Sequence, residues 1–496
     1  MIRRLWHSPT FTSWGSKLAA SARLFLVLPL LLTRFDEVQI ASWFLFGSVS
    51  FLGNVITTQI AVIGSRMMAV ATGGATDLLP VVAGDNTGGD GRPNWPLIER
   101  LYSSFSLINL LGAFVAAAVS CAFGLFALVP LLDKYEGDRG EIWLSFAVIL
   151  LGQFIVESFR RYSIALRGLG NVALVCRWDA LFSVLSAISG GVVLMLGGGV
   201  VALALVMQAL VITAVVRQWF LLNWFVERRF SEMAILRVDR QIVAWLWSPL
   251  WRSVLRALSN RGGAKVGVVI LARHAEPAVL TSVLLCLRLL EMLDDIAATP
   301  MISNVPGFGK LLGAGRIREF RKGVRRAFIL FPVVYIIGIV AICIGGIVGL
   351  KVADANVQFL PVSTFLILSI SYMLAAQIRL SLMISVVGNH VVAVRETFFS
   401  ALVMAVCSLV LIPILPLYGF IISAFLPLIL IVNVVPLRIG CELIDVPVLW
   451  FLKRMFFYPM LLMLLLSGLL LVVDWESRAI VAAEAIKAAW DRLLAL

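Results

Sequence analysis

Residues 245–273, which read WLWSPLWRSVLRALSNRGGAKVGVVILAR, are long enough to cross a bilayer yet carry four cations in their interior, Arg252, Arg256, Arg261 and Lys265. A cation at the centre of a membrane helix costs roughly 2.5–3.5 kcal/mol on insertion scales, so such residues usually face a bundle interior or a watery cavity. At about 1.5 Å of rise per residue, Arg261 is expected near the middle of the membrane. We interpret the segment as one wall of a cationic, water-filled cavity.

The ends of this segment carry aromatic and glycine signals. Trp245, Trp247 and Trp251 are typical of the aromatic belt at a membrane interface, which places Arg252 just inside the apolar layer. The long side chain of Arg252 can also reach water by snorkelling, and this alternative stays open. The glycine pair that begins at Gly262 is expected to break or kink the helix, and interrupted helices often mark transport sites.

The composition of the whole chain is that of a membrane protein. Of its 496 residues 61% are hydrophobic and only 14% are charged, against about 25% charged in soluble domains. Thirteen apolar segments are long enough to be predicted as membrane spans. They are residues 17–33, 39–63, 101–131, 142–167, 171–196, 200–225, 245–273, 277–304, 327–352, 359–387, 390–415, 417–438 and 449–473. The predicted fold is therefore an all-α polytopic membrane protein.

The net charge of +13 follows from basic connections between the spans. Lys and Arg gather at the N-terminus and in the loops after spans two, four, six, eight and twelve, including the stretch 310–326 before the ninth span. Such a bias places these loops, and the N-terminus, in the cytoplasm. Contact with anionic lipid headgroups explains the charge without a nucleic-acid partner. The six cysteines and three histidines are scattered, so neither disulfides nor a metal site is indicated.

An internal repeat is indicated by two Gly-Asn pairs, at Gly170 and Gly388, each followed by an arginine seven residues after the glycine. Both features are 218 residues apart, and the third and ninth spans share this offset. Two parallel lobes of six helices would explain it. We expect an N-terminal lobe at 1–230, a C-terminal lobe at 231–445 and an additional segment at 446–496. The tail 476–496 is expected to be an interfacial amphipathic helix or a fourteenth span.

Three stretches resemble a known family. RLFLVLPLLLTRFDEVQIASWFLFGSV (23–49), SRMMAVATGG (65–74) and ALRGLGNVALVCRWDALFSVLS (165–186) are similar to the polysaccharide (O-antigen type) lipid-linked oligosaccharide flippases of the multidrug/oligosaccharidyl-lipid/polysaccharide exporter superfamily. The resemblance covers roughly residues 15–440. One departure lies in the second span, where ITTQIAVIGSR (56–66) replaces the family's Asp-Leu-Gly-type stretch, so no ion-coupling acid is carried over to that helix.

The resemblance implies two six-helix lobes around a central cavity in the bacterial inner membrane. It also implies alternating access and an undecaprenyl-pyrophosphate-linked glycan that moves from the cytoplasmic to the outer leaflet. Arginine suits such cargo because its planar guanidinium pairs with two phosphate oxygens at once. The predicted cavity residues are Arg23, Arg252, Arg256, Arg261, Lys265 and Arg288. For Arg23, snorkelling at the cytoplasmic side is the alternative.

Acidic residues in the spans are candidates for ion coupling. Arg288, Glu291 and Asp295 share a helix face, which predicts either an internal ion pair or a carboxylate that binds a proton or Na⁺. Glu157 precedes Arg160 and Arg161 by three and four residues, and the same two interpretations apply. A further cation, Arg379, either lines the C-terminal cavity or snorkels.

Two other functions compete with the flippase. A multidrug exporter of the same fold carries mainly cationic cargo, which an arginine-rich cavity would repel. A glycan polymerase or ligase needs a substantial outward loop, and the predicted outward loops are short. We therefore expect a transporter and not an enzyme, with no cofactor other than a possible proton or Na⁺ gradient. The expected partners are the lipid-linked glycan, membrane lipids and polysaccharide-assembly proteins.

Overall fold

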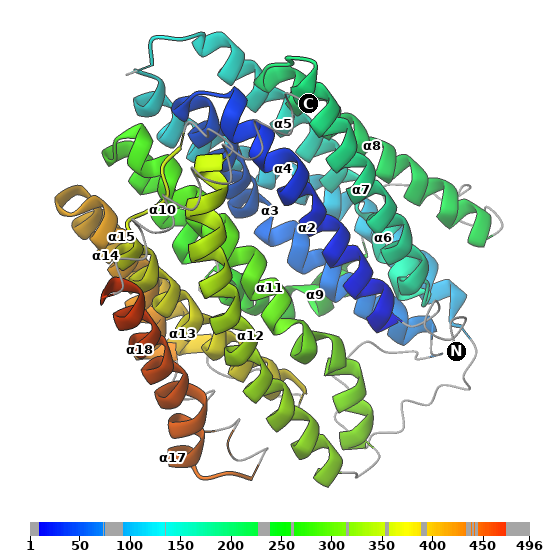
Figure 1. Ribbon diagram of the computed structural model, residues 1–496. Coiled ribbons are helices and arrows are strands. Elements are labelled where there is room, and N and C mark those ends of the chain that lie inside the picture. Colours follow the sequence, from blue (N-terminus) through cyan, green and yellow to red (C-terminus); the bar gives the residue numbers. More distant parts are fainter. Residues whose placement is uncertain are drawn as a thin grey trace, which may run out of the picture. The chain divides into compact units, whose positions relative to one another are not determined.

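The computed structural model describes residues 9–72, 74, 93–133, 135–226, 239–258, 262–313, 317–352, 357–387, 394–432, 438, 441 and 445–472. Within these residues every regular element is a helix, which confirms the all-α fold class (Figure 1). The second Gly-Asn pair, at Gly388, and the tail 476–496 lie outside the described residues.

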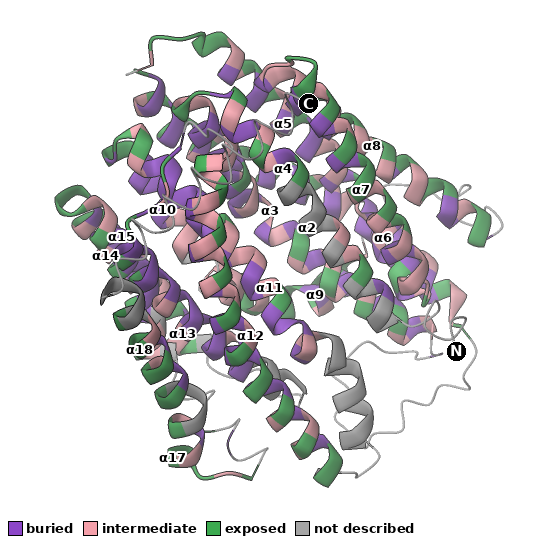
Figure 2. Cartoon of the chain, in the orientation of Figure 1, coloured by how far each residue is buried: buried purple, intermediate pink, exposed green. Residues whose placement is uncertain are grey.

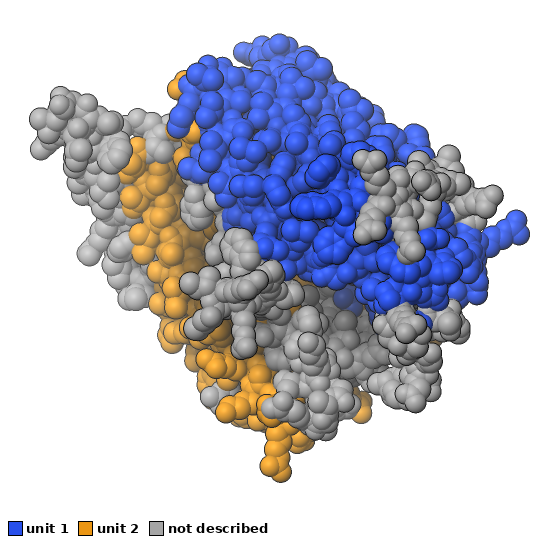
Figure 3. Space-filling view, turned by 90° about the vertical axis from the view of Figure 1, so that its right-hand side faces the viewer, with its two compact units in different colours: residues 1–27, 46–129, 134–258 blue, residues 28–45, 130–133, 259–496 orange. Residues whose placement is uncertain are grey.

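The chain divides into two compact units, whose residues Figure 3 distinguishes by colour. Unit 1 consists of Met1–Val27, Phe46–Val129 and Lys134–Leu258, and unit 2 of Leu28–Leu45, Pro130–Asp133 and Ser259–Leu496. The first three helices contribute residues to both units, and they are α2 (Pro9–Arg34), α3 (Glu37–Thr72) and α4 (Trp95–Asp133). Unit 1 continues with α5 (Arg139–Ser158), α6 (Arg161–Gly168), α7 (Val172–Met195), α8 (Val200–Phe225) and α9 (Arg240–Ala257). Unit 2 continues with α10 (Gly263–His274), α11 (Pro277–Gly313), α12 (Ile317–Val352), α13 (Val362–Val387), α14 (Val394–Ile414), α15 (Pro416–Pro427), the π-helical turns η2 (Leu428–Val432) and η3 (Leu452–Phe457), α17 (Val448–Phe451) and α18 (Tyr458–Val472).

Helix α8 packs against both α5 and α7 in unit 1. A turn at 197–199 joins α7 to α8, as predicted, and Gly197 adopts a φ of +81° there, which glycine tolerates because it lacks a Cβ. The carboxylate of Glu141 on α5 accepts a hydrogen bond from the Val200 N–H at 2.8 Å. This contact satisfies one of the free N–H groups at the start of α8 and holds the two helices in register.

Close approach of α3 to α4 and α5 depends on Gly53. The Gln153 amide of α5 donates to Asn54 Oδ1 at 2.8 Å and to Ser120 Oγ at 3.0 Å, so three helices share a buried polar cluster. A Cβ added at Gly53 would lie 2.5 Å from the Ala116 carbonyl oxygen, which belongs to the backbone of α4. Only a residue without a side chain fits this helix crossing.

We expect Gly53→Ala to lower the thermal unfolding midpoint of the purified protein, because α3 must move away from α4 and strain the polar cluster. Gly47→Ala on the same helix is the matched control, since a Cβ there meets nothing within 4 Å. The control should be neutral or stabilising, by about 0.5–1 kcal/mol as for alanine over glycine in a helix. Equal midpoints for the two variants would contradict this packing.

Helix α9 packs against the core of unit 1. Ile242, Leu246 and Leu250 recur at four-residue spacing, are buried, and join the hydrophobic cluster formed by α3, α4, α6 and α8. The sequence-based boundary at residue 230 assigns this helix to the second lobe instead. The structure places α9 in unit 1 because its stripe of apolar residues is buried against the core of that unit.

The start of α9 is also fixed by polar contacts within unit 1. The Asp239 carboxylate accepts a hydrogen bond from the Gln241 N–H at 2.9 Å and thereby caps the helix. Arg100 of α4 donates through Nε to the same carboxylate at 2.8 Å. The hydrogen bonds from Arg100 lower the pKa of the Asp239 carboxyl below its ordinary value, so the cap is ionised at neutral pH.

Unit 2 is built around two pairs of neighbouring helices, α11 with α12 and α14 with α15. Helix α10 packs against α14 and α15, where Gly267 permits close contact, since an added Cβ would lie 3.0 Å from the Phe420 ring. Thr281 of α11 donates a hydrogen bond to the Glu37 carbonyl at 2.9 Å, which ties the segment Leu28–Leu45 into this unit.

Eight helices of the described part of the chain are long and apolar enough to cross a membrane. They belong to α3, α4, α5, α7, α8, α12, α13 and α14. Helices in Figure 2 combine buried and exposed faces, and large apolar side chains such as Leu196 and Trp224 are exposed. Exposed apolar surface of this extent fits a lipid environment. The protein is a multi-pass membrane protein.

Several predicted segments differ from the observed helices. Span 142–167 is interrupted at Phe159 and Arg160, and next to this interruption the buried Arg161 guanidinium lies over the rings of Tyr102, Phe159 and Tyr162. The described part of the basic stretch 310–326 is helical rather than a loop, because Arg, Lys and Glu are good helix formers. Span 417–438 changes to a π-helical turn after Pro427, whose ring cannot supply a backbone N–H.

Candidate functional site

A carboxylate held by two cations forms the candidate site in unit 2. Lys265 of α10 pairs through Nζ with Glu291 Oε1, and Arg288 of α11 pairs through Nη1 with Glu291 Oε2 at 3.2 Å. Arg288 and Glu291 are three residues apart, so they lie on one helix face. Lys265 lies in the first turn of α10, which begins at Gly263.

The three side chains are partly buried, with exposed fractions of 16% for Lys265, 23% for Glu291 and 47% for Arg288. Two cations on one carboxylate leave a net positive charge. Partial burial strengthens electrostatic attraction relative to water, while the exposed Arg288 remains accessible. Such a cluster can bind an anion in exchange for, or in addition to, its internal carboxylate. The predicted pairing of Arg288 with Glu291 is confirmed, whereas the partnership of Lys265 with Glu291 was not predicted.

The other predicted cations do not share this cluster. Arg252 and Arg256 lie on α9 in unit 1, where Arg252 is exposed and Arg256 is half-buried. The Arg252 guanidinium lies 5.5 Å from the Trp251 ring centre. Among the described residues no carboxylate pairs with either arginine. Arg261 and the side chain of Arg23 lie outside the described residues.

The predicted ion-coupling acids have different surroundings. Glu157 is buried in unit 1 and pairs with Arg160 through both carboxylate oxygens, so the structural pair that the sequence predicts is confirmed. Asp295 is half-buried on α11, and Glu291 rather than Asp295 forms the ion pair with Arg288. Glu291 is therefore the acid in direct contact with predicted substrate-binding cations.

A buried ion pair that the sequence analysis missed joins α11 to α13. Arg379 donates through Nη2 to Asp294 Oδ2 at 2.6 Å, and the exposed fractions of the two side chains are 14% and 3%. The Arg379 guanidinium also lies 5.4 Å from the Tyr372 ring centre. Arg379 was predicted to line a cavity or snorkel; instead it neutralises a buried acid. The sequence does contain a signal for this pair. Arg379 lies inside a predicted span with no acid close to it in the sequence, which indicates that an acid on another helix neutralises it.

Unit 1 contains a comparable arrangement around Asp179 of α7. Arg217 of α8 pairs with Asp179 at 2.8 Å and Arg167 of α6 pairs with it at 3.4 Å. The Arg217 guanidinium is packed 4.8 Å from the Phe182 ring centre and is nearly buried. We interpret this group as a structural link between three helices, because its stronger pair is packed against an aromatic ring.

Comparison with known proteins identifies the fold. No protein-family model and no curated protein sequence matches the chain. An inward-facing multidrug resistance MATE family transporter of the MOP superfamily matches with a TM-score of 0.61 at 13% identity, covering 88% of this chain and 98% of that one. Lipid II flippase MurJ, in an inward closed conformation, matches with a TM-score of 0.57 at 9% identity, covering 98% of both chains. A MOP superfamily transporter from Pyrococcus furiosus matches with a TM-score of 0.54 at 13% identity, covering 89% of this chain and 97% of that one.

At these low sequence identities, the similarity between this chain and the three matched proteins is a similarity of fold. The chain has the all-helical fold of MOP superfamily transporters, along almost the whole length of the matched proteins. The superfamily fold expected from the sequence resemblance is therefore confirmed, and the subfamily of oligosaccharide flippases remains a prediction.

Proposed function

We propose that the protein moves an undecaprenyl-pyrophosphate-linked oligosaccharide from the cytoplasmic to the outer leaflet of the bacterial inner membrane by alternating access. The observation that carries the proposal is the cluster in which Lys265 and Arg288 share the single carboxylate of Glu291. A pyrophosphate is a dense anion, and paired cations at a partly buried site offset its loss of hydration. The fold supports the proposal, because one matched protein is a lipid II flippase.

In this proposal the cations predicted from the sequence bind the substrate anion. Arg288 would pair with two phosphate oxygens through its guanidinium, and Lys265 would add a point charge. Arg252, Arg256, Arg261 and Arg23 would line the remaining path of the anion, as the sequence predicts. Polysaccharide-assembly proteins would supply the lipid-linked glycan and take it up after translocation.

A second candidate function is that of a multidrug exporter, which the similarity to a MATE transporter favours. The net positive charge of the cluster distinguishes the flippase from this alternative. For the Pyrococcus furiosus transporter, a reverse polarity of the binding pocket suggests a different function. Pocket charge is thus a property that distinguishes functions within this fold. A cluster with surplus positive charge attracts phosphate and repels cationic drugs.

Glu291 supplies a means of coupling transport to an ion gradient. The substrate anion and the Glu291 carboxylate compete for the same two cations. When Glu291 binds a proton or Na⁺, Lys265 and Arg288 become available to phosphate; when the ion leaves, the carboxylate displaces the substrate. This competition couples binding of the substrate anion to binding of the ion at Glu291.

We expect Glu291→Gln to bind the substrate at least as well as the wild type but to transport it without response to an imposed proton or Na⁺ gradient. The neutral amide cannot compete for the cations, so the step that depends on ion binding is lost. Proteoliposomes with and without each gradient provide the measurement. Asp295→Asn is the matched control on the same helix. A gradient response that disappears in Asp295→Asn but persists in Glu291→Gln would assign coupling to Asp295 instead.

The proposed function is tested with the wild-type protein in two bacterial strains. In a strain that lacks its oligosaccharide flippase, expression should restore surface polysaccharide. In a strain hypersensitive to cationic drugs, the same expression level should leave drug sensitivity unchanged. Drug resistance without restored polysaccharide would show that the protein is a multidrug exporter.

A further inference from the structure

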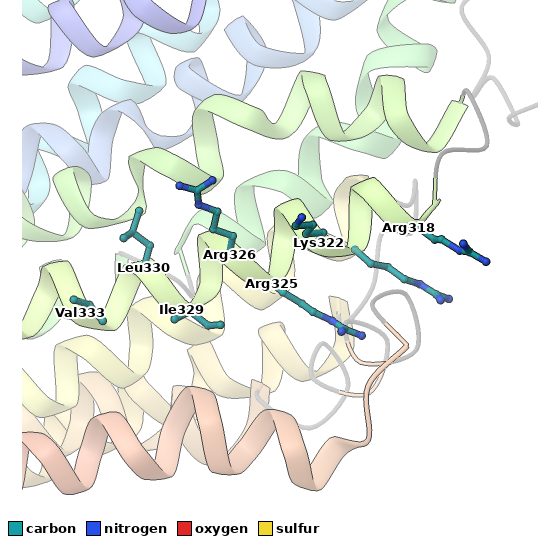
Figure 4. A pocket seen from close by; sticks show the side chains of 8 residues that line it. Arg318, Lys322, Arg325, Arg326, Ile329, Leu330 and Val333 are labelled. Atoms are coloured by element: carbon teal, nitrogen blue, oxygen red, sulfur yellow. The ribbon is translucent and has the colours of Figure 1, made fainter.

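A cavity of ≈ 600 Å³ lies along the first half of α12 (Figure 4). Toward the start of α12 it is lined by five cations, namely Arg318, Arg321, Lys322, Arg325 and Arg326. Further along the helix it is lined by three apolar side chains, Ile329, Leu330 and Val333. The spacing of three and four residues keeps all of them on neighbouring positions of one helix face. The cavity therefore changes from strongly basic to apolar along the helix axis.

Two of the five cations are engaged by the protein. Arg321 pairs with Asp445 at 2.8 Å, and Arg325 donates to the Asp445 carbonyl at 3.1 Å while lying 5.8 Å from the Trp450 ring centre. These contacts fix the side of the cavity next to α17. They also leave the cavity short of negative charge, because Glu319 is the only acid between residues 317 and 333.

The remaining three cations, Arg318, Lys322 and Arg326, are exposed, and no carboxylate of a described residue pairs with them. The apolar residues that continue their face are also exposed, with Leu330 at 42% and Val333 at 48%. On the opposite side of the helix, Phe320, Val324 and Phe331 are buried in the protein. The exposed face is thus a continuous stripe of free cations followed by apolar side chains.

The position of the stripe on the helix indicates its depth. The cations precede the apolar stretch with which α12 is able to cross a membrane, so they lie at the level of the lipid headgroups. The apolar residues begin where the acyl chains begin. At about 1.5 Å per residue, the distance from Arg318 to Val333 is about 22 Å, the span of a headgroup and the upper part of an acyl chain.

We propose that this cavity binds one resident membrane phospholipid with an anionic headgroup. Its phosphate lies between Arg318, Lys322 and Arg326, and an acyl chain lies along Ile329, Leu330 and Val333. Guanidinium groups bind phosphate oxygens in pairs, and basic pockets at the cytoplasmic side of membrane helices suit anionic lipids. A soluble acidic partner would use the cations but not the apolar half. Because it depends on α12 alone, the proposal is independent of the proposed transport function.

The test uses the full-length protein, purified in detergent, depleted of lipid and then titrated with phosphatidylglycerol or phosphatidylcholine, with bound lipid detected by native mass spectrometry. We expect the wild type to bind one phosphatidylglycerol in preference to phosphatidylcholine. The variant Arg318→Gln/Lys322→Gln/Arg326→Gln should lose about a hundredfold in affinity for phosphatidylglycerol and little for phosphatidylcholine. The matched control is Arg34→Gln/Arg139→Gln/Lys351→Gln, which removes the same charge at the ends of α2, α5 and α12, on the side that the Lys/Arg bias predicts to be opposite the cytoplasm.

Two further arms distinguish the sources of phosphate. Leu330→Ser/Val333→Ser should weaken binding of phosphatidylglycerol but not of water-soluble glycerol phosphate, if an acyl chain occupies the apolar half. Undecaprenyl pyrophosphate should fail to displace the bound phosphatidylglycerol at equal concentration. Displacement by undecaprenyl pyrophosphate would assign the cavity to the transport substrate. Equal binding of the two phospholipids by the wild type, or unchanged binding in the triple variant, would overturn the proposal.

Discussion

Replacing Lys265 and Arg288 together with glutamine is expected to reduce transport of the lipid-linked oligosaccharide to background while the protein still inserts at normal levels. Each hydrogen bond to a charged group contributes about 1.5–3 kcal/mol, so loss of both cations corresponds to a decrease of at least about a hundredfold. Both substitutions remove charge from segments that the sequence predicts to cross the membrane, which eases insertion. Surface polysaccharide in a flippase-deficient strain, normalised to protein level, provides the measurement.

The control for this variant is Arg167→Gln/Arg217→Gln in unit 1. It removes the same charge and also leaves one carboxylate, Asp179, without its two arginines. A general effect of lost charge or of a stranded acid would impair both variants equally. If transport depends on the Lys265–Arg288 cluster, the control should retain far more activity per molecule of protein than the Lys265→Gln/Arg288→Gln variant. Equal activity of the two variants would contradict the assignment of the site.

Asp294→Asn is expected to cause the largest loss of stability. The substitution leaves the Arg379 guanidinium charged and nearly buried without its carboxylate. Removing one member of a buried pair typically costs about 3–5 kcal/mol, because the remaining charge keeps its desolvation penalty. The double variant Asp294→Asn/Arg379→Gln carries no buried charge and should recover most of this loss. Thermal unfolding in detergent, followed by intrinsic fluorescence, compares the three proteins.

An exposed pair serves as the matched control for Asp294. Asp445→Asn removes the partner of Arg321, but the Asp445 side chain is 71% exposed. Exposed pairs contribute about 0–1 kcal/mol, so this variant should unfold close to the wild type. Asparagine also tolerates the positive φ of 57° at this position. A double variant at Asp294 and Arg379 as unstable as Asp294→Asn alone would show that the ion pair is not the cause.

The extent of several helices could be predicted from the sequence because local signals mark their ends. Helix α8 has the predicted bounds, since the glycine turn before Val200 leaves no alternative start. Helix α11 begins at Pro277 as predicted, because proline suits the first turn of a helix. These signals depend on neighbouring residues only, and the sequence displays them directly.

Contacts between distant residues could not be predicted in the same way. Arg288 and Glu291 are three residues apart, so their pairing follows from helix geometry. Arg379 and Asp294 are 85 residues apart, and only the packing of α11 against α13 brings them together. Asp295 rather than Asp294 was expected to matter because it shares a face with Arg288. One residue corresponds to about 100° of rotation around a helix, which is enough to exchange an exposed face for a buried one.

The most direct measurement of substrate recognition compares two lipids that differ in one chemical group. Proteoliposomes that contain the wild-type protein are loaded with an undecaprenyl-pyrophosphate-linked oligosaccharide or with an analogue in which an uncharged linker replaces the pyrophosphate. Translocation is followed by the accessibility of the glycan to an external lectin. We expect rapid translocation of the pyrophosphate lipid, slowed by the Lys265→Gln/Arg288→Gln substitutions, and translocation of the neutral analogue at the rate of protein-free vesicles. Equal rates for the two lipids would contradict recognition of the anion by these cations.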